Sequence, residues 1–150
     1  MKRHPALAPL SREHHSALVL AKRALRASTG GFDAINHFVA EVERVFACDL
    51  EPHFQLEERW LLPALIRVGQ YKAVEQTLAE HAELRSLASQ PGINRPVILR
   101  RFGDALAEHV RFEERELFPL AESTLDEEAL ESIREGTAAP SFKERRTTDK

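Results

Sequence analysis

Apolar side chains recur every three or four residues along most of this chain, which is the spacing of amphipathic α-helices. Four long segments show the pattern, and no segment alternates in the way that a β-strand requires. The connections between the segments are short, so consecutive helices are expected to run antiparallel. The pattern therefore predicts an all-α fold, an up-down-up-down antiparallel four-helix bundle.

Capping residues indicate where these helices begin. Ser11 and Asp33 are suited to cap the first and second helices, because their side-chain oxygens can accept bonds from free backbone amides. The third helix is expected over residues 71–88, and Pro96 suits the first turn of the fourth. The apolar stripe of each helix then faces a common core.

Three prolines interrupt the stripes. Pro52 lies inside the second helix and predicts a kink just before His53, or a break into two helices, because proline lacks an amide hydrogen and clashes with the preceding turn. Pro63 and Gly69 are expected to close the second helical segment, and Pro119 to mark the end of the fourth.

The C-terminal part differs from the rest in composition. Asp126 is suited to cap a short fifth helix that reaches Arg134. Residues 136–150 are polar and charged, and we expect a flexible tail there. The predicted organisation is a bundle domain over residues 1–135 followed by this tail.

Length and composition narrow the class of protein. A chain of 150 residues most simply forms one domain, and a net charge of −3 does not suggest a nucleic-acid surface. No apolar run approaches the roughly 20 residues that span a bilayer, and the N-terminus does not resemble a signal peptide. The single cysteine, Cys48, excludes an internal disulfide and fits a reducing compartment. These features favour a cytoplasmic protein with no nucleic-acid or membrane partner.

One motif occurs twice. Residues 53–63 and 109–119 both read H-x-x-x-E-E-R-x-L-x-P. Histidine and glutamate four residues apart lie on the same face of a helix, so His53 pairs with Glu57 and His109 pairs with Glu113. Both pairs fall on the apolar, buried side of their helices.

The repeat extends to the other two helices. The first carries Glu13-His14-His15 and the third carries Glu80-His81, each beside its apolar stripe. A pseudo-twofold bundle would thus gather four histidines and two glutamates. Burying them without compensation costs several kcal/mol per charge, and a metal offsets that cost. Imidazole with carboxylate favours a pair of iron or manganese ions; small zinc sites more often recruit cysteine.

Two adjacent histidines, His14 and His15, are candidates for the metal ligand from the first helix. His14 and His15 lie about 100° apart around the helix axis, so they cannot both face one site. The apolar stripe favours His14, whereas the match of His15-x-x-Leu18 to His81-x-x-Leu84 favours His15. We take His15 as the predicted ligand and His14 as the alternative.

Three acidic residues near the motif histidines and glutamates are not among the six predicted ligands. Asp49, one turn before His53, is either a hydrogen-bond acceptor for a ligating imidazole or a solvated capping residue. Glu58 and Glu114 follow the motif glutamates by one residue and are predicted to be surface residues, with an additional metal ligand as the alternative.

These motifs together resemble the hemerythrin-like, or HHE cation-binding, family. The resemblance covers roughly Leu10 to Glu122 and rests on residues 12–18, 53–63, 80–84 and 109–119. It implies a four-helix bundle with a non-haem di-iron centre. The implied terminal ligands are the first-helix histidine, His53, His81 and His109, with Glu57 and Glu113 as bridges.

The chain departs from the oxygen carriers of that family at one place. Those proteins have a second histidine one turn after the third-helix histidine, and here that position is Arg85. The resemblance therefore implies an additional open iron position, which favours binding or sensing of dioxygen, peroxide or nitric oxide, or iron handling, over reversible oxygen carriage. No acid–base pair separate from the ligands is visible, so a binding protein is favoured over the alternatives, a di-iron oxidase or peroxidase and a metal-free helical interaction module.

Overall fold

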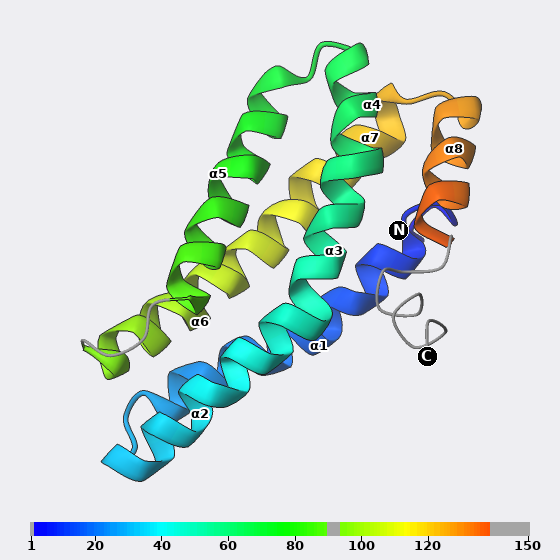
Figure 1. Ribbon diagram of the computed structural model, residues 1–150. Helices are drawn as coiled ribbons and strands as arrows, with labels where there is room; N and C mark the ends of the chain where they lie inside the picture. Colours follow the sequence, from blue (N-terminus) through cyan, green and yellow to red (C-terminus); the bar gives the residue numbers. More distant parts are fainter. Residues whose placement is uncertain (1, 90–93, 139–150) are drawn as a thin grey trace, which may run out of the picture.

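Four long helical segments form an antiparallel bundle in the computed structural model of the chain, which describes residues 2–89 and 94–138 (Figure 1). The second and fourth segments are continuous helices that contain short π-helical turns. The elements are α1 (Ala8–Ala27), α2 (Phe32–Val45), η1 (Phe46–Leu50), α3 (Glu51–Leu56), η2 (Glu57–Leu61), α4 (Leu62–Arg67), α5 (Tyr71–Ala88), α6 (Arg95–Phe112), η3 (Glu113–Leu117), α7 (Phe118–Thr124) and α8 (Glu127–Ala138). No strand occurs in the described ranges, so the predicted all-α bundle is confirmed.

The predicted helix starts differ from the observed ones by a few residues. Helix α1 begins at Ala8 with a proline in its first turn, so Ser11 is not its cap; the Ser11 hydroxyl instead bonds the carboxylate of Glu114. Helix α2 begins at Phe32, one residue before the predicted cap Asp33. The third helix has the predicted bounds, and Pro96 lies in the first turn of α6.

The prolines do not end their helices, because a π turn precedes each of them. Pro52, Pro63 and Pro119 all lie two residues beyond a π turn, and the helices continue to Arg67 and Thr124. In each turn a backbone amide bonds the carbonyl five residues earlier, as Leu62 does to Glu57 and Phe118 does to Glu113. A π turn holds one residue more than an α turn, so the missing amide of proline is accommodated where the bonding pattern changes. The expectation that Pro63 and Pro119 close the helices was therefore wrong, whereas Gly69, with a φ of 82°, does follow the end of the second segment at Arg67.

Two apolar cores lie along the bundle, one on each side of a polar layer. The first core is lined mainly by α1, α2, η1 and α6, and the second core mainly by η2, α4, η3, α7 and α8. Representative residues are Phe38, Val42, Phe46, Phe54, Phe102 and Leu106 in the first core, and Leu61, Leu65, Leu117, Phe118, Leu130 and Ile133 in the second. Among the described residues, no helix is both long and apolar enough to cross a membrane.

Helices α1 and α6, which are far apart in the sequence and each carry one of the predicted ligands, pack closely against each other. A Cβ atom at Gly103 of α6 would lie 2.8 Å from the Ala21 carbonyl oxygen and 2.8 Å from Leu25 Cγ. Only glycine allows this approach. The contact aligns the central part of α1 with α6 and brings His14 beside Glu113.

The fifth helix, α8, closes the end of the bundle beside the N-terminus (Figure 1). Asp126 accepts a bond from the Ala129 amide at 2.8 Å, which confirms its predicted capping role. The helix continues past the predicted end at Arg134, and Gly136 lies against the Trp60 ring. The rest of the predicted tail, residues 139–150, lies outside the described residues.

Candidate metal centre

Between the two cores lies a layer of four histidines and two glutamates, each at most 4% exposed. The histidines come from four different helical segments: His14 from α1, His53 from α3, His81 from α5 and His109 from α6. Glu57 and Glu113 are the first residues of the π turns η2 and η3. The layer thus contains charged and polar groups at a depth where only apolar side chains are expected.

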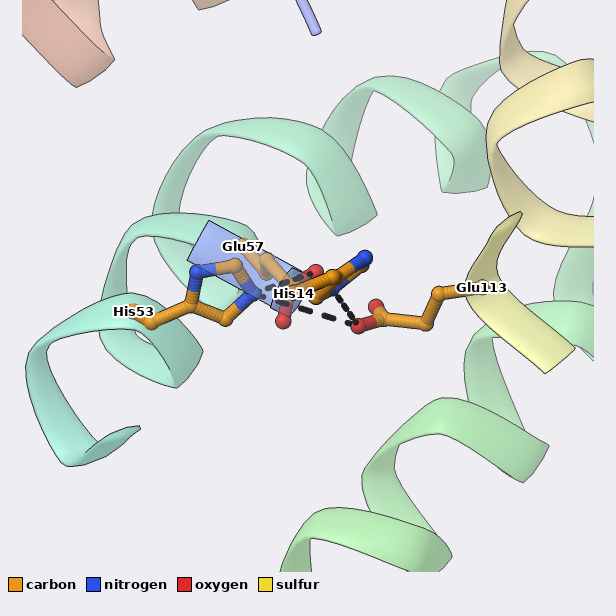
Figure 2. Close-up of side chains that lie close together, drawn as sticks. All are labelled: His14, His53, Glu57 and Glu113. Carbon is orange, nitrogen blue, oxygen red and sulfur yellow. Dashed lines mark hydrogen bonds and ion pairs between the residues drawn. The ribbon is translucent and has the colours of Figure 1, made fainter. Parts of the chain in front are cut away.

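The six side chains form two overlapping groups. His14 and His53 with both glutamates make the first half, shown in Figure 2, and His81 and His109 with the same glutamates make the second half. Within each group the potential ligand atoms all lie within 4.8 Å of one another. Two groups that share two carboxylates match what a carboxylate-bridged pair of metal ions requires.

Each glutamate contacts one histidine from each half. Glu57 Oε2 lies 3.4 Å from His53 Nε2, and its Oε1 lies 3.3 Å from His81 Nε2. Glu113 Oε1 lies 3.1 Å from His14 Nε2 and 3.0 Å from His109 Nε2. Both carboxylates therefore occupy a bridging position between the halves.

An outer carboxylate faces the other ring nitrogen of every histidine. The Nδ1 atoms of His53, His81 and His109 donate to Glu13, Glu58 and Glu80 over 2.6, 2.6 and 2.7 Å. Nδ1 of His14 lies 3.4 Å from Glu114, a longer contact. Such partners fix the tautomer and the ring direction, so all four Nε2 atoms face the interior of the layer.

Several of the inward-facing atoms have no hydrogen-bond partner within the described part of the chain. They are the Nε2 atoms of His53, His81 and His109, both oxygens of Glu57 and Oε2 of Glu113. Buried polar atoms of this kind cost roughly 1–3 kcal/mol each when unsatisfied. Metal ions held by the inward-facing atoms would satisfy them, so the residues fit a metal centre.

The protonation of the metal-free layer reflects its opposing charges. Burial lowers the pKa of His109, but the charge and close approach of Glu113 and the hydrogen bond to Glu80 outweigh it and raise the pKa to about 10. The pKa values of His14, His53 and His81 are raised against burial by their own glutamate partners. Burial would raise the pKa of Glu113, yet attraction to His109 holds it well below its ordinary value. Protons thus balance the carboxylates without metal, and metal entry would displace them.

The structure corrects the predicted placement of the first-helix histidine. His15 is exposed and lies outside both groups, whereas the alternative, His14, is buried among the other five side chains. The apolar stripe was the better guide. The sequence did contain a signal for His14, because Glu13-His14 repeats the dipeptide Glu80-His81. The two glutamates have the same role in the structure: Glu13 accepts a hydrogen bond from His53, and Glu80 accepts one from His109.

The acidic neighbours of the motif glutamates were also misplaced by the sequence analysis. Glu58 bonds His81, and Glu114 approaches His14, so both belong to the outer shell and are not simple surface residues. Their pKa values are lowered despite burial, chiefly by hydrogen bonds to these histidines. The two adjacent glutamates of each motif therefore have different roles. The first, Glu57 or Glu113, faces the centre, and the second, Glu58 or Glu114, contacts a histidine of another helix.

Arg85 lies over the second half of the centre. Its Nε is 2.8 Å from Glu51, its Nη1 is 2.9 Å from Glu58, and its guanidinium lies over the Phe54 ring. Phe54 in turn stacks on His81, with ring centroids 3.9 Å apart and 11° between the planes. These contacts cover the His81 side.

A cavity of about 440 Å³ opens beside the first half, between α1 and the η1–α3 region. His14, His53, His109 and Glu113 reach its inner end. His81 and Arg85 are not among its lining residues. The cavity therefore lies on the His14 and His53 side of the centre, away from Arg85.

Fold and site together define a helical bundle with a buried histidine–carboxylate cluster in its core that is able to hold metal ions. The sequence profile of the hemerythrin HHE cation binding domain matches residues 6–121, so the chain belongs to the hemerythrin HHE cation-binding family. Searches of curated proteins and of solved structures gave no significant match. The family and the residue groups support a cation-binding function with a metal cofactor.

Proposed function

We propose that this chain holds a non-haem di-iron centre and uses it to bind or sense dioxygen or a related small species such as peroxide or nitric oxide. The observation that carries the proposal is the convergence of six buried side chains whose inward-facing atoms lack partners. His14 and His53 would hold one ion, and His81 and His109 the other. Glu57 and Glu113 would bridge them, each touching one histidine of each half.

The donor set supports iron. All six groups are imidazoles or carboxylates, and the only cysteine of the chain, Cys48, is exposed and is not part of either group. Nitrogen and oxygen donors without thiolate favour iron or manganese over a structural zinc site. A reducing compartment such as the cytoplasm, which the single cysteine favours, would supply iron in the ferrous form.

The chain's own residues would prepare the centre for a small ligand. Iron held by these six residues would supply the electrons for the chemistry of a diatomic or peroxide species. Glu13, Glu58 and Glu80 hold the imidazoles in place, so little reorganisation is needed when charge changes at the centre. The two apolar cores exclude water from both ends of the layer.

Metal analysis tests the proposal directly. The purified chain, loaded anaerobically with ferrous iron, should approach two irons per chain, and manganese and zinc loaded in parallel should show the preference. Mixing the loaded protein with oxygen in a stopped-flow instrument should give rapid oxidation. A folded chain that takes up no iron would sink the di-iron proposal, and a stable reversible oxygen complex would favour carriage.

A di-iron oxidase or peroxidase is the second candidate. The observation that favours it is the cavity, which is much larger than a diatomic ligand needs. Sustained turnover of oxygen or peroxide with an added organic reductant would support this candidate over a binding protein.

A further inference from the structure

The cavity beside the first half is more than a passage for gas molecules. Its volume of about 440 Å³ falls within the range of pockets that bind small organic molecules. At about 30 Å³ for a water molecule in the liquid, it has room for roughly 15 waters. A two-atom ligand would leave most of this space unfilled.

The walls of the cavity are mainly apolar. They are formed by α1, the end of α2, the π turn η1 and α6, through Ala17, Leu20, Val45, Leu50, Leu106 and Val110. A well-ordered chain of water has few polar partners along such walls, whereas an aliphatic chain would bury apolar surface against them.

The two ends of the cavity are polar and restrict the charge of an occupant. At the mouth lie the exposed residues Glu13, Ser16, Cys48 and Asp49, and no lysine or arginine is among the lining residues of the described chain. This acidic mouth disfavours an anion. The inner end meets the centre at His14, His53, His109 and Glu113, where imidazoles and a carboxylate in contact oppose one another in charge and favour a head group of neither sign.

From this arrangement we propose that the cavity binds an uncharged aliphatic oxygen compound of the size of a medium-chain alcohol, with its hydroxyl group against the centre and its chain along the apolar walls. A hydroxyl group both donates and accepts hydrogen bonds, so it suits a layer that presents both carboxylate and imidazole. The inference deepens the proposed function, since its polar end rests on the proposed metal ligands; the apolar part of the cavity exists without them.

The single cysteine gives a direct readout. Cys48 is exposed and lines the mouth, so an occupant should shield it from a maleimide reagent. The probes are 1-octanol, octanoate and octylammonium, which share one chain and differ in charge. With 1-octanol at about nine times its Kd, the modification rate should fall about tenfold, because the free fraction falls by that factor. The two charged probes should protect far less at equal concentration.

A blocked cavity provides the control. Ser16→Phe places a ring at the exposed mouth and should remove the dependence of the modification rate on octanol, whereas Val19→Phe adds the same ring at an exposed α1 position outside the cavity and should not. Circular dichroism confirms that both variants fold. Equal protection in the wild type and Ser16→Phe, or none in either, would overturn the inference, as would stronger protection by octanoate.

The cysteine-protection experiment and the iron-loading experiment test the two proposals independently. Two irons per chain without octanol protection would remove the cavity ligand and leave the di-iron centre. Protection of the metal-free chain together with failure to load iron would support the cavity and remove the centre.

Discussion

The two halves of the centre share Glu57 and Glu113 but differ in their surroundings. Both histidines of the first half border the cavity, and Glu13, the outer partner of His53, is half exposed at its mouth. In the second half, His81 lies beneath Phe54 and beside the pairs that Arg85 makes with Glu51 and Glu58. His109 of the second half also reaches the cavity, so the contrast lies chiefly in His81, and an incoming ligand would approach the centre from the side of the first half.

The largest effect is expected from the shared glutamates, which test whether the halves are one site. Glu113→Ala should reduce bound iron from two to less than one per chain, because it removes a ligand from both groups. Iron analysis after anaerobic loading measures the loss. Glu116→Ala, at an exposed position in the same π turn, is the matched control. Unchanged iron in Glu113→Ala would contradict the bridging role.

Single histidine variants should separate the halves. His14→Ala should empty the first half and leave about one iron, and His81→Ala should do the same for the second half, because each removes a ligand from one group only. His15→Ala should retain full iron, since His15 is exposed. If the His14 variant kept both irons while the His15 variant lost one, the structural assignment of the first helix would be wrong.

The outer carboxylates should show a smaller and unequal effect. Glu80→Gln and Glu13→Gln each weaken the acceptor that orients a histidine, which typically lowers metal affinity by about 10–100-fold. Glu80 should matter more, because its side chain is 26% exposed and that of Glu13 is 53% exposed, so solvent screens Glu13 more strongly. Competition with a chromophoric chelator gives both affinities. A larger loss in the Glu13 variant would reverse the comparison.

Arg85 should have the smallest effect on metal affinity. Its ion pairs with Glu51 and Glu58 are partly exposed, so Arg85→Ala should weaken iron binding by less than about tenfold. The loss should fall on the second half, because Glu58 orients His81. Stepwise iron titration distinguishes the two ions, with the exposed Arg111 replaced by alanine as control. A loss of both irons would mean that Arg85 supports the whole bundle.

Spacing along the chain was sufficient to predict the bundle and most of the centre. Histidine and glutamate four residues apart in a repeated motif fix which side chains share a face, and the structure brings His53, Glu57, His81, His109 and Glu113 together as that repeat requires. Spacing could not choose between His14 and His15, because the choice depends on how far α1 is rotated about its axis.

The remaining errors came from effects outside local spacing. A proline was taken to end a helix, but the π turns before Pro63 and Pro119 let each helix continue. The roles of Glu58 and Glu114 depend on histidines from other helices, 23 and 100 residues away in the chain. Only the three-dimensional arrangement joins those pairs.

The division of the apolar interior by the polar layer also bears on cooperativity. Because the first and second cores lie on opposite sides of charged groups, each has its own hydrophobic stabilisation. The unsatisfied atoms of the layer between them add no comparable stabilisation. Ions bound by ligands from all four segments would tie the two ends of the bundle together, so the metal-loaded chain should unfold in one cooperative transition.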